Sequence, residues 1–139
     1  IQLKKLNAIV ARRRMLVAIY NSLLKEVKDI ITPLEKKHLK SNWQSYCIRI
    51  VPTHDIMKIM QRLLVRGIST RRGIMCSHLE TVYKKEPFTW SGKSIGKPIN
   101  LDESIFARDH CIILPLFHEI EEKEIEKVCR TIKEIIKNR

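Results

Sequence analysis

Apolar residues near the start of the chain recur every three or four positions, among them Leu3, Leu6, Val10, Val17 and Tyr20. This period predicts an amphipathic helix over residues 3–27, which at 1.5 Å per residue would be ~40 Å long. A helix of that length in a small domain is typical of an element that spans two bodies or forms an interface. A coiled coil is the alternative, but the apolar stripe is too broad and too short to favour it.

Shorter patterns follow. Residues 44–51 alternate, with Tyr46, Ile48 and Ile50 on one side, which predicts a half-buried strand that ends at Pro52. Further strands are expected at residues 68–71 and 111–117, helices at 56–66, 102–110 and from about 120 onwards, and a loop at 86–100. This order predicts one α+β domain over residues 1–139: a small sheet of about three strands with helices packed on one face, preceded by a long N-terminal helix.

Composition adds a strong charge bias to this picture. The 139 residues include 27 Lys and Arg against 15 Asp and Glu, a net charge of +12. Such a balance favours anionic partners, so a non-enzymatic basic module that binds nucleic acid or an acidic protein is one hypothesis. The basic residues are spread along the chain and are not gathered in one block, which argues against a nucleic-acid partner. No apolar run reaches the ~20 residues of a membrane span, so no membrane partner is expected.

The cysteines carry no metal or disulfide signature. They are Cys47, Cys76, Cys111 and Cys129, and none forms a C-x-x-C pair. Cys76 with His78 and His110 with Cys111 could supply four zinc ligands, but neighbouring residues on a strand face opposite sides, so no metal site is expected. Cys76 with His78 could also act in nucleophilic catalysis, but no third group that would orient them is apparent. Unpaired cysteines without a secretory signal indicate a reduced, cytoplasmic location.

Arg71 and Arg72 stand out chemically. They follow the short strand expected at 68–71 and precede Gly73. Alternation along an extended segment would point one arginine inward and the other outward. An arginine at a strand end can hold a phosphate or carboxylate through two parallel hydrogen bonds. A salt bridge to an acidic residue between 102 and 109 is an equally good explanation.

Four blocks together resemble a known family. Residues 2–24, 41–51, 66–83 and 108–128 are similar, in order and at compatible spacing, to the C-terminal small domain of the DegT/DnrJ/StrS-type aminotransferases. These are fold-type I enzymes that use pyridoxal 5′-phosphate (PLP). The resemblance implies transfer of an amino group, usually from glutamate, to a nucleotide-linked keto-sugar in polysaccharide or glycan biosynthesis, by a homodimer.

The resemblance also implies what this chain lacks. In that family the Schiff-base lysine and the acid beneath the pyridine nitrogen belong to a large N-terminal domain. That domain is absent from this sequence, which begins at Ile1 within a helical pattern and is therefore expected to be a fragment. No catalytic residue is assigned here, no cofactor is expected on the fragment, and the fragment alone is expected to be inactive. A vestigial or regulatory relative is a further alternative.

The remaining implied roles concern the substrate side. The segment after the second strand lines the sugar site in the family, which implies substrate contacts from Arg71, Arg72 and His78. The block Asn42, Trp43 and Gln44 matches a segment near the edge of the cofactor. His78 is expected to bind and not to catalyse.

Overall fold

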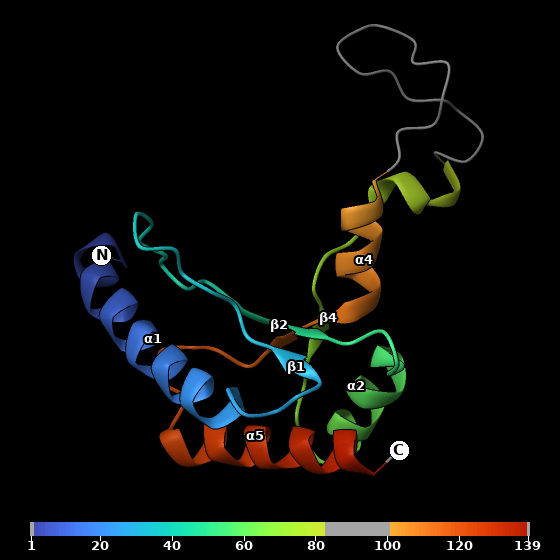
Figure 1. Cartoon of the computed structure of the whole chain (residues 1–139). Coiled ribbons are helices and arrows are strands. Elements are labelled where there is room, and N and C mark those ends of the chain that lie inside the picture. The colour runs from blue at the N-terminus through green and yellow to red at the C-terminus, as the bar shows by residue number, and fades with distance from the viewer. Residues whose placement is uncertain (1, 83–100, 139) are drawn as a thin grey trace, which may run out of the picture.

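The computed structural model describes residues 2–82 and 101–138. Its helices are α1 (Gln2–Leu24), α2 (Ile56–Val65), α4 (Asp102–His110) and α5 (Glu122–Lys137), with a 3₁₀ turn η1 (Ser77–Leu79). Its strands are β1 (Ile30–Ile31), β2 (Tyr46–Ile50), β3 (Arg71–Arg72) and β4 (Cys111–Leu114). They form one antiparallel sheet in the order β1-β2-β4-β3. The predicted α+β fold with a long first helix is confirmed (Figure 1).

The sheet differs from the prediction in number and bounds of strands. It has four strands, because β1, only two residues long, pairs with β2 and is too short to leave an alternating pattern. The strand expected at 68–71 begins only at Arg71, since Ile68 is buried and its amide bonds to the Leu63 carbonyl at the end of α2. The strand expected at 111–117 ends at Leu114, just before Pro115, which has no N–H to donate. The loop expected at 86–100 lies outside the described residues.

One face of the sheet, here called the inner face, carries the core. The register sets Ile48 beside Ile112 and Tyr46 beside Leu114, and all four are at most 1% exposed. They pack against the apolar stripe of α5, whose buried members are Ile125, Val128, Cys129, Ile132, Ile135 and Ile136. Helices α1 and α2 also pack against α5 (Figure 1). The opposite, outer face carries Cys47, Arg49, Cys111 and Ile113 by the same register.

Helix α4 lies on the other side of the sheet from α5 (Figure 1). It leads directly into β4, and its Phe106 ring lies beneath the Arg49 guanidinium, 5.0 Å from ring centroid to Cζ. This cation–π contact ties α4 to the outer face of β2. No helix of the described residues has the length and apolar character that crossing a membrane requires.

The arginines of α1 hold neighbouring segments to the helix. Arg12 donates to the Ile120 carbonyl at 3.2 Å and lies 3.8 Å from a Glu122 carboxylate oxygen. Arg14 pairs with Glu35 in the loop between β1 and β2. Arg12 and Arg14 thus both meet acceptors from segments far away in the chain.

Candidate functional site

The two adjacent arginines of β3 lie on opposite faces of the sheet. Arg72 is paired with Ile112, a core residue, so it belongs to the inner side, whereas Arg71 is paired with Ile113 on the outer face. The outer face therefore carries a row formed by Cys47, Ile113 and Arg71 across three neighbouring strands. The alternation predicted from the sequence places each arginine in a different environment.

Arg72 is engaged with α2. Its Nε and Nη2 atoms approach the Met57 sulfur at 3.3 and 3.1 Å. Asp109, one of the acidic partners considered for these arginines, pairs instead with Arg108 at 2.7 Å, which holds the pKa of the Asp109 carboxyl below its usual value. Arg72 adds only a small favourable charge effect on that carboxyl. Arg72 thus acts as a packing residue at the edge of the sheet.

Arg71 lines a pocket of ≈ 160 Å³ at one end of the sheet. Three segments meet there: residues 44–45 before β2, 69–71 at the start of β3, and 113–116 at the end of β4. Ile113 and the two residues after β4, Pro115 and Leu116, supply apolar surface, while Arg71 supplies the charge. Arg71 is exposed and forms no ion pair with any described residue. Within the described part of the chain, no carboxylate competes with an anion for its guanidinium.

The turn that leads into β2 is held in an unusual conformation. Trp43 has a φ of 49°, in the left-handed region that large side chains rarely adopt. Its amide donates to Ser41 Oγ, and the Gln44 amide donates to Asn42 Oδ1, both at 3.1 Å. The Trp43 ring is buried and packs 6.4 Å from the ring of Tyr46. These contacts fix Gln44 at the pocket, while Asn42 and Trp43 hold the turn.

His78 lies apart from this pocket. It is in η1, half-buried, and its Nε2 atom is buried without a hydrogen-bond partner in the described structure. It is not among the residues that line the Arg71 pocket. Of the six residues singled out from the sequence, the structure brings Arg71 and Gln44 together and leaves His78 and Arg72 elsewhere. The binding roles of all six stay predictions.

Sequence reasoning missed several residues of the pocket. Ser45, Ser69 and Thr70, which carry hydroxyl groups, line it, and so does the apolar residue Leu116. Serine and threonine near strand ends are too common to mark a site, so only the pairing of β2, β3 and β4 reveals them. In the stretches 2–82 and 101–138, no three His, Cys, Asp or Glu side chains are grouped as they would be around a metal ion.

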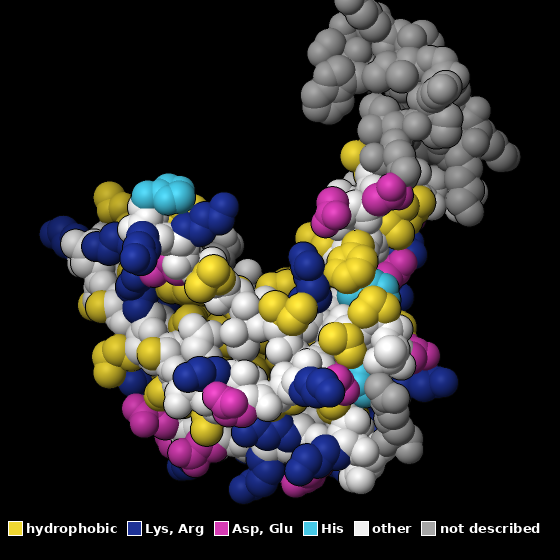
Figure 2. Space-filling model, viewed as in Figure 1, with side chains coloured by type: hydrophobic (Ala, Val, Ile, Leu, Met, Phe, Trp, Pro, Cys, Tyr) yellow, Lys and Arg dark blue, Asp and Glu magenta, His cyan; other side chains and the backbone are white. Residues whose placement is uncertain are grey.

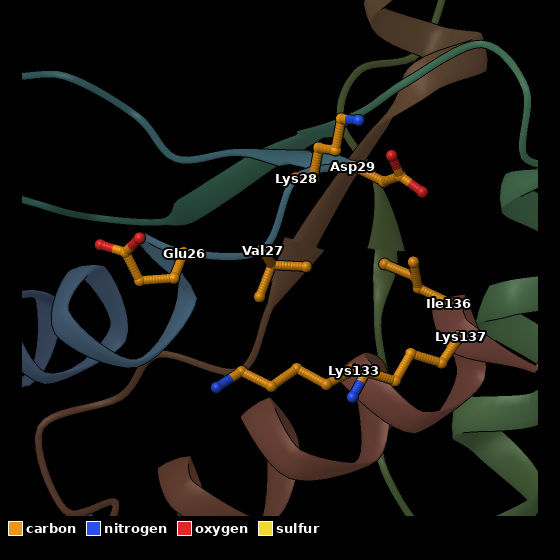
Figure 3. A pocket seen from close by; sticks show the side chains of 7 residues that line it. All are labelled: Glu26, Val27, Lys28, Asp29, Lys133, Ile136 and Lys137. Atoms are coloured by element: carbon orange, nitrogen blue, oxygen red, sulfur yellow. The ribbon is translucent and has the colours of Figure 1, made fainter.

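A second, larger cavity of ≈ 550 Å³ lies between the α1–β1 connection and the end of α5. Figure 3 shows Val27 and Ile136 facing each other across it, whereas the carboxylates of Glu26 and Asp29 point away to opposite sides. The Asp29 carboxylate is hydrogen-bonded to His54 Nε2 at 2.9 Å. No residue singled out from the sequence lines this cavity, so it is separate from the candidate site.

Comparisons with known proteins agree with this architecture. A search of curated proteins finds the uncharacterised protein MJ1066 of Methanocaldococcus jannaschii, 29% identical over 140 residues that cover 97% of this chain and 34% of MJ1066. Among solved structures, Helicobacter pylori PseC, an aminotransferase of pseudoaminic acid biosynthesis, matches with a TM-score of 0.81 and 19% identity. The aminotransferase TlmJ from Streptoalloteichus hindustanus matches with a TM-score of 0.80 and 21% identity.

These matches cover nearly all of this chain and a minority of each relative. The match to PseC covers 99% of this chain and 35% of PseC. The match to TlmJ covers 98% of this chain and 34% of TlmJ. The chain thus spans about a third of the length of the proteins that it matches. The family model of the DegT/DnrJ/EryC1/StrS aminotransferases matches residues 1–133. The chain, with the fold that its aminotransferase neighbours share, belongs to the DegT/DnrJ/EryC1/StrS aminotransferase family.

Proposed function

We propose that this chain is the C-terminal small domain of a PLP-dependent aminotransferase that transfers an amino group, from glutamate, to a nucleotide-linked keto-sugar. Its place is in polysaccharide or glycan biosynthesis, as a cytoplasmic homodimer. The large domain that completes the enzyme lies outside these 139 residues. The role of this chain is to form one wall of the substrate site.

The observation that carries this proposal is the family match over residues 1–133. Neighbouring structures support the substrate class: PseC is an aminotransferase of pseudoaminic acid biosynthesis, and DesI was solved with its TDP-sugar product. A neighbour from Streptococcus pneumoniae was solved in both a PLP form and a PMP form, which supports the cofactor. The pocket with Arg71 and Gln44 supports this role, because it combines serine and threonine residues with a cation that has no ion-pair partner among residues 2–82 and 101–138.

The residues of this pocket do not fit PLP by themselves. A PLP site needs a lysine for the Schiff base and a carboxylate near the pyridine nitrogen. The described residues that line the Arg71 pocket include neither. The cofactor would therefore be held by the rest of the enzyme, and the chain alone should show no amino transfer.

The test begins with the protein as its own gene encodes it. Mass spectrometry would measure its intact mass and the amino transfer from glutamate to a panel of nucleotide-linked keto-sugars. Its absorption after addition of PLP would be recorded by spectrophotometry. We expect a mass well above that of this chain and an aminated product. The 139-residue chain alone, as the matched control, should give neither a cofactor band nor product. A full-length protein that binds PLP and yet aminates none of the sugars would contradict the substrate class.

A basic binding module remains the second candidate, because it accounts directly for the net charge of +12. Against it, Arg12, Arg14 and Arg108 are engaged by carboxylates of Glu122, Glu35 and Asp109. Figure 2 shows dark-blue basic side chains over several parts of the visible face, interspersed with acidic ones. Binding to random DNA that falls steeply with salt would favour this candidate. A vestigial relative would instead bind nucleotide sugar without turnover.

A further inference from the structure

The geometry of the outer face points to Arg71, and not Arg72, as the ligand of one small oxyanion. We propose that the Arg71 pocket binds a single carboxylate or phosphate group of a substrate. Its source, the amino-acid donor or the nucleotide carrier, rests on the proposed function; the anion binding itself does not.

The first step is that the guanidinium groups of Arg71 and Arg72 have different partners. Arg72 is directed to the inner side of the sheet and is in contact with the Met57 sulfur. Arg71 is on the outer face, is exposed, and is unpaired with any described acidic side chain. A guanidinium without a carboxylate partner keeps its five N–H donors for a ligand, and its planar fork matches an oxyanion.

The second step is the composition of the pocket wall. Ser45, Ser69, Thr70 and Gln44 line it, so residues that carry hydroxyl or amide donors share the pocket with Arg71. No carboxylate lines it. The wall thus offers one positive charge, several neutral donors and no competing negative charge. This combination favours an anion over a neutral sugar ring.

The third step is size. Pockets that enclose a drug-sized ligand have volumes of roughly 300–1,000 Å³. The Arg71 pocket, at ≈ 160 Å³, is too small for a whole nucleotide sugar but large enough for one anionic group. The apolar surface of Ile113, Pro115 and Leu116 lies beside it, against which the carbon skeleton of the same molecule can pack.

The fourth step is rigidity. Arg71 and Ile113 are paired within the sheet, and Gln44 is positioned by the hydrogen-bonded turn at Trp43. A binding group carried by strands and a fixed turn is preorganised, so little conformational entropy is lost when the anion binds. The unfavourable φ of Trp43 next to the pocket fits this pattern, because strained backbone is concentrated at binding sites.

The test is titration of the chain with two probes, L-glutamate and inorganic pyrophosphate, followed by NMR shifts of Thr70, Arg71 and Ile113. The variants are Arg71→Gln, Arg71→Lys and Arg72→Gln, with Arg66→Gln as a control that removes the same charge at an exposed site after α2. We expect saturable binding of at least one probe. Arg71→Gln should weaken it at least about tenfold, because a charge-assisted bidentate contact is lost.

Arg71→Lys should fall between wild type and Arg71→Gln, because lysine keeps the charge and loses the planar fork. Arg72→Gln and Arg66→Gln should bind as the wild type does. Preference for glutamate would assign the pocket to the donor, and preference for pyrophosphate would assign it to the nucleotide carrier. Equal weakening in all the glutamine variants, or no saturable shift with either probe, would overturn the proposal.

The outcome is separable from that of the proposed function. Anion binding is measured on this chain without amino transfer. Arg71-dependent binding with no aminotransferase activity in the full-length protein would reject the enzyme and retain the anion site. Aminotransferase activity of the full-length protein without Arg71-dependent anion binding would retain the enzyme and reject the anion site.

Discussion

Arg14 on α1 and Glu35 in the following loop form a two-pronged ion pair, with Nη1–Oε1 and Nη2–Oε2 distances of 2.9 and 2.6 Å. The same Glu35 accepts a hydrogen bond from the Ser41 amide, and Arg14 donates to the Ser41 carbonyl at 2.6 Å. One ion pair thus fastens both ends of residues 35–41 to the first helix. That segment leads directly into the turn at Trp43, so its position is coupled to the wall of the candidate site.

Replacing Glu35 by glutamine should destabilise the fold in a pH-dependent way. The hydrogen bond from Arg14 is the main cause that lowers the pKa of the Glu35 carboxyl below its usual 4.5. A carboxyl with a lowered pKa in the folded state stabilises the fold above its unfolded pKa, and this contribution is lost as pH falls through the folded pKa. The difference in unfolding free energy between wild type and Glu35→Gln should therefore be present at pH 7 and shrink below about pH 4.

Urea unfolding followed by circular dichroism at several pH values measures this difference. Glu26→Gln is the matched control, because the Glu26 side chain is 86% exposed and its nearest cation, Lys25, is 3.9 Å away. The control should change stability little at any pH. A Glu35→Gln effect that is the same at pH 3 and pH 7 would show that the charge of Glu35 is not what holds the loop.

A second prediction concerns the stacked tyrosines in the core. The rings of Tyr20 and Tyr46 lie 4.6 Å apart at 17°, and both residues are fully buried. Tyr20 donates to the Pro115 carbonyl at 2.8 Å, and Tyr46 donates to Asn21 at 2.7 Å. Tyr20→Phe should cost about 1–3 kcal/mol, since it leaves that carbonyl without its partner, and Tyr20→Ala should cost about 3–5 kcal/mol through the cavity it leaves.

The same pair predicts the alkaline limit of stability. Burial is the main cause that raises the pKa of both tyrosines above their usual value of 10. The fold therefore holds them protonated, and stability should be constant up to about pH 9 and decline as pH rises above 10, where the unfolded chain ionises. The double variant Tyr20→Phe/Tyr46→Phe should lose part of that decline. Unfolding free energies from pH 8 to 11 test it, and an unchanged decline in the double variant would assign it to other groups.

Two of the elements that the sequence predicted well have a period that repeats along one face of the core. The stripe of α5 and the alternation of Tyr46, Ile48 and Ile50 are visible because each buried position recurs several times. The helix at 102–110 was expected with the bounds that α4 has. Local spacing carries this information, so no long-range contact is needed to read it.

The parts that could not be predicted depend on pairing between distant segments. The sequence indicates that Arg71 and Arg72 point in opposite directions, but only their register with Ile113 and Ile112 decides which of them is inner. In the same way, Gln44 and Arg71 are 27 positions apart and meet because β2 and β3 flank β4. Candidate residues could thus be chosen from the sequence, but their grouping into a site could not.

A third prediction is slow thiol chemistry at Cys47. This half-buried thiol lies beside Ile113 on the outer face, and burial is the main cause that raises its pKa to about 11, with Cys111 nearby as a second cause. The reactive thiolate is then only about one part in a thousand at pH 8. Its alkylation by iodoacetamide at pH 8 should be on the order of a hundredfold slower than in the urea-unfolded chain.

Mass spectrometry of tryptic peptides over time resolves each cysteine separately. Cys129, with a pKa raised by burial to about 12 and a 1% exposed side chain, should react more slowly still. Cys47→Ser removes the expected site of slow labelling and should leave the labelling of Cys76 and Cys129 unchanged. Labelling of Cys47 in the folded chain at the unfolded rate would mean that the outer face opens, or that its thiolate is far more populated than burial allows.

A fourth prediction separates two glycines by the reason each position needs one. A Cβ on Gly73 would lie 2.5 Å from Cys111 Cβ and 2.9 Å from the Ala107 carbonyl oxygen, so Gly73→Ala must push β3 away from β4 at a cost of about 1–3 kcal/mol. Gly67 has open space around it but a φ of +75°, so Gly67→Ala should cost about 1–2 kcal/mol through backbone strain alone. Gly67→Asn should recover part of that loss, because asparagine tolerates the left-handed region, whereas Gly73→Asn should be worse than Gly73→Ala.

Urea unfolding of these four variants distinguishes the two causes. Equal responses of both sites to alanine and asparagine would contradict a steric role for Gly73. The Gly73 variants should also shift the NMR signals of Arg71 and Ile113, because the Gly73 amide bonds to the Cys111 carbonyl at 2.8 Å and holds the edge strand beside the pocket.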